Sequence, residues 1–368
     1  MKILFLTASY GTGHVTANKW TQQALVKSHP EVDTLIVDFL KDKDYSQSGS
    51  IFNRFYNWSM EMPIIWDKIF DLSNSFLAHF YFKNIFARLY HSFYRLFKKE
   101  KPDLFVTTHP YWNFIIENYK NRFKEHSKCV TIVTDSTAIH RTWITSGVDY
   151  YIVADEESRT AMKVLGVDEG KLFVAGFPVN PELGEPFDKE SFLTKLGMET
   201  GIPTVLVVVG LGDVKKFIKI VHTLGKQVSF NFQIIVITGK YRTVYRTLNK
   251  RGYLVRTKIL GWTNRMADFL RASDIVISKG GGAIVMETLA AGKPIIIPVF
   301  TPGQERGNAK LIMKYGLGYA GTALSEVFRY TYNLLSLPQR LTDLQNHVRR
   351  FSKPDAAKNI AEFIYKIR

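Results

Sequence analysis

Short apolar runs rich in β-branched residues recur along the chain and alternate with stretches of helical character. In the first half they are KILFLTA, TLIVDFL, DLFVTT, CVTIVTD and DYYIVAD, and in the second half TVLVVVG, FQIIVITG, IVISK and KPIIIPV. Strands that are apolar on both faces and are joined by helices are typical of parallel sheets covered on both sides. The pattern therefore predicts an α/β fold with two doubly wound halves.

A stretch rich in proline, glycine and charge, GFPVNPELGEPFDKESFLTKLGMETGIP, separates the two halves. It is typical of a linker followed by the opening helix of a second domain. We place the boundary near Pro181, which gives domains of residues 1–181 and 182–353, each long enough to bury its own core. Residues 354–368 have a helical apolar spacing, and we expect them to return and pack on the first domain.

Positive charge dominates the surface, because 49 Lys and Arg stand against 33 Asp and Glu, a formal net charge of +16. Such a surface attracts anions, whether nucleotide phosphates, nucleic acid or acidic lipid headgroups, and charge alone does not choose among them. Cys129 is the sole cysteine, which excludes an intramolecular disulfide and fits a reducing compartment. Its neighbours, CVTIV, predict a buried strand.

Membrane insertion is not expected from the sequence. The first apolar run, MKILFLTASYG, is shorter than a signal peptide and has no small-residue cleavage site after it. The chain also has no run of roughly 18 uncharged apolar residues, the length that a membrane-spanning helix needs. Any membrane contact is therefore predicted to be peripheral.

An aromatic segment, residues 51–97, interrupts the α/β pattern. One helical face would carry Phe82, Phe86, Leu89, Phe93 and Leu96. Basic side chains, among them Arg95, Lys98 and Lys99, would lie elsewhere on the helix. Two interpretations stay open at this point: a core helix with a solvated basic side, or an amphipathic surface that lies in the headgroup region of a membrane.

The region from Ser278 to Asn308 carries the strongest chemical signal. A strand runs into Lys279 and three glycines, and a helix then follows from about Ala283 to Ala291. Glycines at such a turn let an anion approach the backbone, and the helix N-terminus offers free N–H groups to a diphosphate. Glu287, one turn into the helix, can reach a ribose diol. A glycine turn can also serve packing alone, but this combination is more specific.

His14 is the candidate base. It ends the turn YGTGH after the first strand, where open α/β sheets place their ligand crevice. A neutral imidazole can take the proton of an attacking hydroxyl, although a helix-start histidine satisfied by backbone is the alternative. Asp135, after another strand, is either the alternative base or the group that orients His14. We expect His109 and His140 to be structural or to line the acceptor site.

Three motifs in register resemble one known family. GGGAIVMETLAAGKPIIIPVFTPGQERGNA resembles the donor signature of the monogalactosyldiacylglycerol synthases and the bacterial processive diacylglycerol glucosyltransferases, which are relatives of the peptidoglycan lipid II synthase. TASYGTGHVTAN is similar to their glycine-rich acceptor motif, and VTDSTAIHRTWITSGVDYYIVADEESRTAMKVLGV with GFPVNPEL matches their middle section. The resemblance implies the GT-B architecture, two Rossmann-like domains that face each other across a cleft.

The resemblance also implies roles for individual residues. Those expected at the diphosphate lie in two glycine-rich turns and are Gly210, Gly212, Gly281, Gly282 and Ala283. Glu287 would bind the ribose hydroxyls, and Gln304 and Glu305 would hold the hexose hydroxyls. ILGWTNRM resembles the loop that holds uracil, with Trp262 packing on the base and the backbone of Thr263 reading its edge.

The activity implied is an inverting transfer of glucose or galactose from a UDP-sugar to diacylglycerol or a glycosyl-diacylglycerol, which makes a glycoglycerolipid. The first domain would hold the lipid acceptor and dock on an anionic membrane, and the second would hold the donor, placing the protein peripherally on the cytoplasmic face of the cell membrane. No cofactor and no metal are expected, because Asp42-Lys43-Asp44 lies in a polar loop and no GxxxxGK[ST], HExxH or CxxC motif occurs.

Other functions stay open beside this one. A lipid II type N-acetylglucosaminyltransferase or a UDP-sugar epimerase would have the same architecture, although an epimerase would not need the aromatic segment. A non-catalytic UDP-sugar binding protein would retain the donor pocket without turnover. Nucleic acid is not an expected partner, because the sequence has no groove-reading motif.

Overall fold

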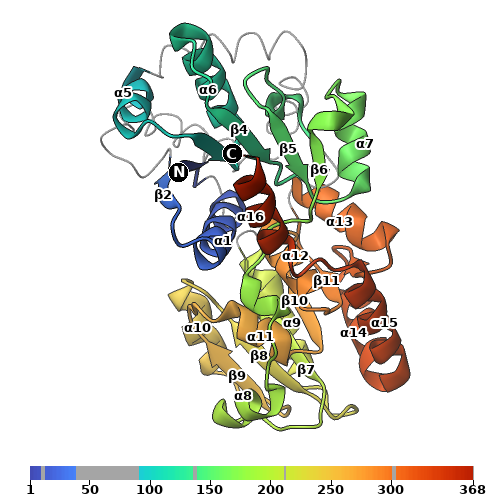
Figure 1. Ribbon diagram of the computed structural model, residues 1–368. Helices are drawn as coiled ribbons and strands as arrows, with labels where there is room; N and C mark the ends of the chain where they lie inside the picture. Colours follow the sequence, from blue (N-terminus) through green and yellow to red (C-terminus); the bar gives the residue numbers. More distant parts are fainter. Residues whose placement is uncertain (10–12, 39–90, 136–138, 211–212, 301–303, 368) are drawn as a thin grey trace. The chain divides into compact units, whose positions relative to one another are not determined.

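The alternating pattern folds into two separate parallel sheets (Figure 1). The computed structural model describes residues 1–9, 13–38, 91–135, 139–210, 213–300 and 304–367. Contacts divide the chain into two compact units. One contains Met1–Pro181 and Asp355–Arg368, and the other contains Glu182–Thr301 and Glu305–Pro354. The α/β prediction with two doubly wound halves is confirmed.

The first unit holds a six-stranded parallel sheet in the order β2-β1-β3-β4-β5-β6. The strands are β1 (Lys2–Thr7), β2 (Asp33–Asp38), β3 (Leu104–Thr107), β4 (Lys128–Ile132), β5 (Tyr150–Val153) and β6 (Leu172–Val174). The helices are α1 (Gly13–Ser28), α5 (His91–Glu100), α6 (Pro110–Phe123), α7 (Glu156–Val164) and α16 (Ala356–Lys366), with a 3-10 turn η1 (Arg141–Trp143).

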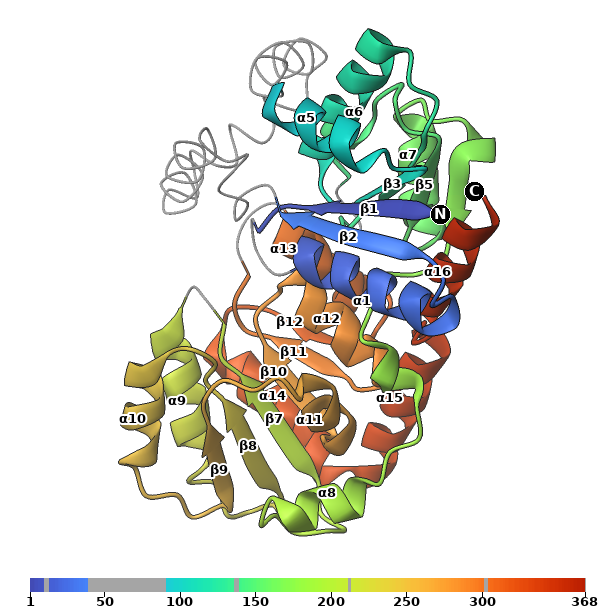
Figure 2. The same ribbon diagram turned by 60° about the vertical axis from the view of Figure 1, so that its left-hand side comes forward.

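Side-chain alternation in β1 shows why this sheet is covered on both faces. Leu4 and Leu6 point into a core formed with α5, α6 and α7, whereas Ile3 and Phe5 point into a core formed with α1 and α16. Figure 2 shows α1 below the β1–β2 edge and α5 and α6 above it. Because successive strand residues face opposite sides, a continuously apolar run is needed to fill both cores.

The C-terminal helix α16 belongs to the first unit. Its Ile360, Ala361 and Ile364 are fully buried beside Leu25 of α1. The ring of Tyr365 stacks on His29, with 3.6 Å between ring centroids. Apolar burial on this scale fixes the helix to the sheet face that α1 also covers.

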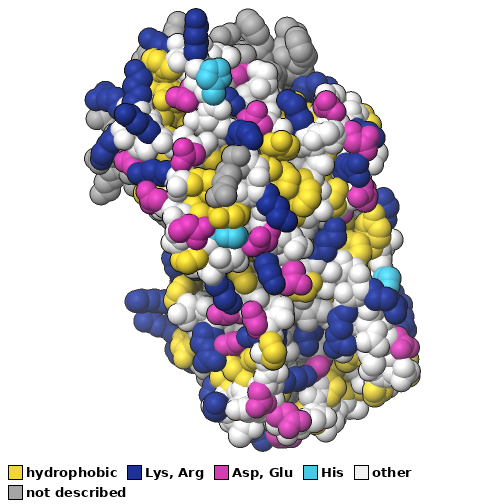
Figure 3. Space-filling view, in the orientation of Figure 1, with side chains coloured by type: hydrophobic (Ala, Val, Ile, Leu, Met, Phe, Trp, Pro, Cys, Tyr) yellow, Lys and Arg dark blue, Asp and Glu magenta, His cyan; other side chains and the backbone are white. Residues whose placement is uncertain are grey.

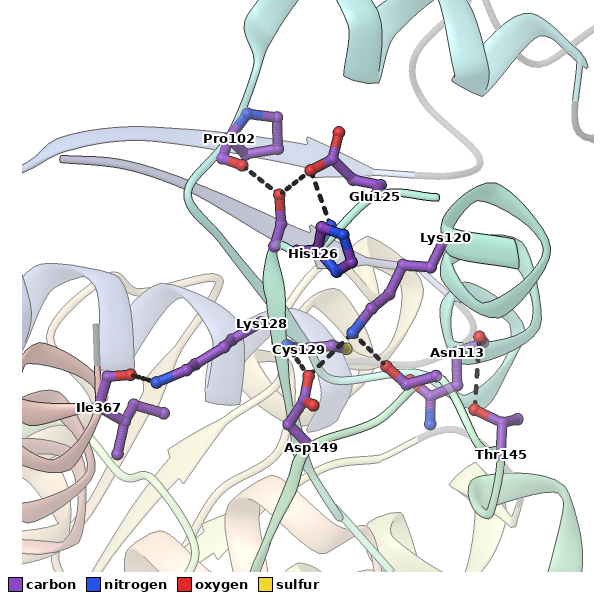
Figure 4. A network of polar contacts seen from close by, with 12 residues as sticks. Pro102, Asn113, Lys120, Glu125, His126, Lys128, Cys129, Thr145, Asp149 and Ile367 are labelled. Atoms are coloured by element: carbon purple, nitrogen blue, oxygen red, sulfur yellow. Dashed lines mark hydrogen bonds and ion pairs between the residues drawn. The ribbon is translucent and has the colours of Figure 1, made fainter. Parts of the chain in front are cut away.

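A network of partly buried and exposed polar contacts ties the middle strands to their helices (Figure 4). The Asp149 carboxylate accepts from the backbone N–H of Cys129 at 2.8 Å and from Lys120 Nζ of α6 at 3.0 Å. Lys128 Nζ donates to the Ile367 carbonyl at 2.7 Å, which anchors the end of α16 to β4. Burial raises the pKa of the Cys129 thiol to about 12, so the prediction of an inert cysteine on a buried strand is confirmed.

Helix α5 decides between the two interpretations for the end of the aromatic segment. Phe93, Leu96 and Phe97 are buried in the first unit's core, and Phe93 is only 1% exposed. The lipid-facing interpretation is therefore wrong for these three side chains, because they pack on Trp112 and Phe105. Arg95, Lys98 and Lys99 are exposed, as both interpretations require.

The remaining aromatic residues, from Ile51 to Tyr90, lie outside the described residues, as does the loop with Asp42 and Asp44. Within the ranges that the structure describes, no helix is long and apolar enough to cross a membrane.

The second unit also holds a six-stranded parallel sheet, in the order β12-β11-β10-β7-β8-β9. The strands are β7 (Thr204–Val208), β8 (Gln233–Ile237), β9 (Thr257–Leu260), β10 (Ile275–Ser278), β11 (Ile295–Ile297) and β12 (Gly318–Ala320). The helices are α8 (Lys189–Lys195), α9 (Val214–Leu224), α10 (Arg242–Asn249), α11 (Met266–Ala272), α12 (Gly282–Ala290), α13 (Gln304–Lys314), α14 (Leu324–Ser336) and α15 (Pro338–Phe351). Each strand predicted from the sequence is present.

Candidate functional site

The topological switch point of the first unit lies between β1 and β3, which are neighbours in the sheet although β2 lies on the other side of β1. Ligands of open α/β sheets bind at the carboxyl ends of the strands at this point. His14 is the second residue of α1, the helix that follows β1, and Thr108 follows β3. The structure therefore places the candidate base where the fold leaves a crevice.

The imidazole of His14 is held by its Nδ1 atom. This atom lies 2.7 Å from the backbone carbonyl oxygen of Thr108 and 2.8 Å from the hydroxyl oxygen of Thr134. Because a carbonyl oxygen only accepts, Nδ1 carries the hydrogen, and the lone pair of the neutral ring is on Nε2. Burial lowers the pKa of His14 to about 4, so the ring is neutral at pH 7 and Nε2 can take a proton.

The second candidate base, Asp135, follows β4 and joins the same group of side chains. Its carboxylate accepts a hydrogen bond from Trp143 Nε1 at 2.7 Å. Burial raises the pKa of Asp135 to about 6, although the Trp143 hydrogen bond opposes this shift. The Trp143 ring centroid is 6.2 Å from that of His14. Trp143 thus lies beside both candidate bases, a role that sequence reasoning missed although HRTW is part of the middle motif.

Two further histidines near this site cap helices. His109 is the N-cap of α6, and its ring lies edge-on to His14 with 4.7 Å between centroids. Burial, together with the nearby His14, holds the pKa of His109 well below its ordinary value. His140 is the N-cap of η1 and accepts from the Thr142 N–H at 3.2 Å. As N-caps, both histidines satisfy N–H groups at a helix end.

In the second unit the switch point lies between β7 and β10. Gly210 follows β7, and Lys279 follows β10. A Cβ atom on Gly210 would lie 2.4 Å from Cγ and Cδ of Lys279, so the glycine is needed for the close approach of these two turns. Gly212 lies outside the described residues.

The glycine turn before α12 is firmly held. Asn308 Nδ2 donates to the Gly280 carbonyl at 2.8 Å, and the Gly280 N–H donates to the Val299 carbonyl at 2.9 Å. Gly281 is the N-cap of α12 and provides no side-chain cap, while Gly282 and Ala283 open the helix. The first-turn N–H groups at this helix end have no partner within the helix, which is the arrangement that anion binding uses.

Three side chains predicted around this turn have different surroundings. Glu287 is half-buried one turn into α12. Glu305, in the first turn of α13, forms an ion pair with Lys279 at 2.5 Å. Gln304 begins α13, and its side chain lies outside the described residues. The Lys279–Glu305 pair, which sequence reasoning did not predict, brings the end of β10 and the start of α13 together.

A pocket of about 630 Å³ opens at the carboxyl ends of β8 and β9. Its lining residues are Gly239, Lys240, Arg242, Tyr245, Gly261 and Trp262. Trp262 is 64% exposed, and the Thr263 hydroxyl accepts from the Arg265 N–H at 3.0 Å. The predicted base-binding loop thus borders this open pocket. Sequence reasoning missed the contributions of Lys240, from the loop after β8, and of Arg242 and Tyr245, from α10.

Among the residues that the structure describes, no group of three or more His, Cys, Asp or Glu side chains could hold a metal ion. The geometry of the two sites suits proton transfer at His14 or Asp135 and anion binding at the start of α12.

Each half of the chain matches a known family model. Residues 14–179 match the monogalactosyldiacylglycerol (MGDG) synthase family model, and residues 204–367 match the C-terminal domain of glycosyltransferase family 28. The chain is similar to a processive diacylglycerol beta-glucosyltransferase of Bacillus pumilus, at 24% identity over 99% of this chain and 94% of the relative. It is 27% identical to monogalactosyldiacylglycerol synthase 3 of Arabidopsis thaliana over 80% of this chain and 63% of the plant protein.

Solved structures with this fold include MurG of Acinetobacter baumannii, with a TM-score of 0.65, 12% identity and full coverage of both chains. A UDP-GlcNAc 2-epimerase of Neisseria meningitidis bound to UDP-GlcNAc has a TM-score of 0.64 and 13% identity, also with full coverage of both chains. At this identity the likeness shows the GT-B fold alone and does not choose between transfer and epimerisation.

Proposed function

We propose that this protein transfers a hexose from a UDP-sugar to diacylglycerol or a glycosyl-diacylglycerol, because residues 14–179 match the MGDG synthase family model and residues 204–367 match the C-terminal domain of glycosyltransferase family 28. The observation that carries the proposal is that both matches are in register with a candidate base in one unit and an anion site in the other. The product is a glycoglycerolipid.

In the proposed reaction the acceptor hydroxyl gives its proton to Nε2 of His14 as its oxygen attacks the anomeric carbon. The new carbon–oxygen bond forms as the bond to UDP breaks, which inverts the configuration at that carbon. UDP leaves with the bonding electron pair, stabilised by the N–H groups at Gly281, Gly282 and Ala283. Asp135 is the alternative base. If His14 is the base, the Asp135 carboxylate favours the imidazolium that forms on His14.

The donor roles follow the same geometry. We assign the ribose hydroxyls to Glu287, the hexose hydroxyls to Gln304 and Glu305, and the uracil to Trp262 with the backbone of Thr263. Gly210 and Gly212 belong to the turn that approaches the phosphates from β7. The ion pair of Glu305 with Lys279 supports its role, because it fixes a carboxylate 4.0 Å from where a Cβ on Gly281 would lie.

We place the protein peripherally on the cytoplasmic face of the cell membrane. The proposed acceptor is a membrane lipid, and a net charge of +16 favours an anionic leaflet. On the first unit, Arg95, Lys98 and Lys99 form an exposed basic side of α5, while Lys98 Nζ lies 3.9 Å above the Phe123 ring. The Lys98 ammonium thus makes a cation–π contact with this ring while the side chain stays exposed.

One experiment tests the activity directly. The protein is incubated with UDP-glucose, UDP-galactose or UDP-N-acetylglucosamine and diacylglycerol vesicles, and lipids and nucleotides are identified by mass spectrometry. We expect hexosyl-diacylglycerol and free UDP. Transfer from UDP-N-acetylglucosamine alone would favour a lipid II type enzyme, and an isomerised UDP-sugar without a lipid product would favour an epimerase. Binding of a UDP-sugar without any turnover would indicate a non-catalytic UDP-sugar binding protein.

Replacing Glu287 with Ala is expected to raise the Kd for UDP roughly 10- to 100-fold, because a ribose diol loses charge-assisted hydrogen bonds. Isothermal titration calorimetry with UDP measures this. Glu326→Ala is the matched control, because Glu326 lies on α14 and pairs with Arg329. An unchanged Kd in Glu287→Ala would remove this residue from the donor site.

A further inference from the structure

One long segment of the second unit contains no acidic residue. Between Asp213 and Asp268 the sequence has twelve Lys and Arg and neither Asp nor Glu. This segment forms α9, β8, α10 and β9, so its charge is concentrated on one part of the sheet and its covering helices. The like charges of this segment repel one another.

The exposed side of α10 carries the centre of this charge. Arg242, Arg246 and Lys250 are spaced by four residues, so they form one row along the helix, and all three are exposed. Val244 and Leu248 point the other way, into the core. In Figure 3, Lys and Arg side chains project from the left edge, over the position of α10 in Figure 1.

Protein carboxylates do not neutralise this row. Elsewhere in the segment, Arg256 pairs with Glu199 at 2.7 Å and Arg265 pairs with Asp268 at 2.7 Å. For Arg242, Arg246 and Lys250, the described part of the chain provides no carboxylate within ion-pair distance. The row is therefore available to an anionic partner outside the molecule.

Aromatic side chains lie at one end of the row. Tyr245 is 40% exposed and Trp262 is 64% exposed. Together with Lys240 and Arg242 they line the pocket at the carboxyl ends of β8 and β9. Trp262 is assigned to the uracil, which leaves Tyr245 on the outer side of α10 between Arg242 and Arg246. An exposed Tyr ring interleaved with Arg is a composition that the headgroup layer of a bilayer favours, because the ring has an apolar body and a polar edge.

We infer that the α10 face, formed by Arg242, Tyr245, Arg246 and Lys250, docks on an anionic lipid bilayer. The choice of a bilayer over another polyanion rests on the proposed function, because the acceptor is then a lipid. The donor unit thus has a membrane contact of its own, separate from the basic side of α5 in the first unit.

The test compares two triple variants of the full chain. Arg246→Gln/Lys250→Gln/Arg251→Gln removes exposed charge from and next to the α10 face without touching the pocket lining. Arg340→Gln/Arg350→Gln/Lys353→Gln removes the same charge from exposed positions on and just after α15. Partition into phosphatidylglycerol–phosphatidylcholine vesicles is measured by co-sedimentation at two salt concentrations, with pure phosphatidylcholine vesicles as the neutral reference.

At low salt the α10 triple variant is expected to lose on the order of 100-fold in partition, and the loss shrinks at high salt. The α15 variant should lose far less. Equal losses in both variants, or full binding of the α10 variant, would overturn the inference, since net charge rather than this face would then govern binding. If the α10 variant loses binding to duplex DNA while its vesicle binding is unchanged, the occupant of this face is a nucleic acid. This result would also overturn the inference.

Failure of this inference differs from failure of the proposed function. Vesicle binding is measured without a donor, so it is independent of turnover. If the α10 variant keeps full transfer to diacylglycerol in neutral detergent micelles while losing vesicle binding, both statements hold. If the protein binds vesicles through α10 but transfers no hexose, the proposed function is wrong and the inference stands. If the protein transfers hexose and the α10 variant binds vesicles as well as the wild type does, the inference is wrong and the proposed function stands.

Discussion

Replacing His14 with Gln is expected to lower kcat/KM for lipid glycosylation by about 10²- to 10⁴-fold, the usual contribution of a positioned general base. Gln lacks a group that can accept a proton at the Nε2 position, although it is similar in size. The Kd for UDP should be unchanged, because His14 lies in the first unit whereas the residues assigned to the uracil, ribose and diphosphate lie in the second. Steady-state kinetics and calorimetry with UDP measure the two quantities.

His126→Gln is the matched control, because this histidine is exposed on the loop before β4 and contacts neither candidate base. It should retain full activity. A His14→Gln enzyme with at least a tenth of the wild-type rate would contradict the assignment.

The pH dependence of the wild-type enzyme separates His14 from Asp135. A general base must be unprotonated, so kcat/KM falls as pH falls through its pKa. With a His14 pKa of about 4, the rate should stay level from pH 8 to 6 and decline only toward pH 4. An acid limb centred near pH 6 would instead match the Asp135 pKa of about 6. If the Asp135→Asn variant then lacks this acid limb, the role of general base belongs to Asp135 and not to His14.

The sequence predicted where the candidate base lies but not what holds it. A strand followed by a glycine-rich turn and a helix places His14 at the carboxyl end of β1 from local pattern alone. The two groups on its Nδ1 are Thr108 and Thr134, which are 94 and 120 residues away in the chain. Only the order of β1, β3 and β4 in the sheet brings them together, and that order is not written in any local pattern.

The donor turn shows the same division. Glycines before a helix are visible in the sequence, and they predicted an anion site at the start of α12. The ion pair between Lys279 and Glu305, and the packing of Gly210 on the Lys279 side chain, join three turns of the sheet. These contacts depend on β7 and β10 being neighbours, which follows from tertiary pairing.

Helix α5 shows a limit of a different kind. An apolar face opposite a basic face has the same periodicity whether it packs on a protein core or on lipid, because burial of apolar area drives both. The sequence therefore could not choose between the two. In the structure, the rings of Phe93 and Phe97 lie 4.7 Å and 6.4 Å from that of Trp112, so this face belongs to the core.

Phe93→Ala is consequently expected to destabilise the first unit by about 3–5 kcal/mol, the cost of removing a fully buried aromatic ring and leaving a cavity. Its ring packs edge-on against Trp112, which is itself fully buried, so neighbouring side chains have little freedom to fill the space. Urea unfolding followed by tryptophan fluorescence measures the change in the free energy of unfolding.

Arg95→Gln is the control on the same helix, because Arg95 is exposed and its replacement should change stability by no more than about 0.5 kcal/mol. Vesicle binding adds an independent readout. A core role predicts that Phe93→Ala keeps its vesicle partition under conditions where it remains folded. A variant as stable as the wild type but unable to bind vesicles would contradict the core role and return this face of α5 to the membrane.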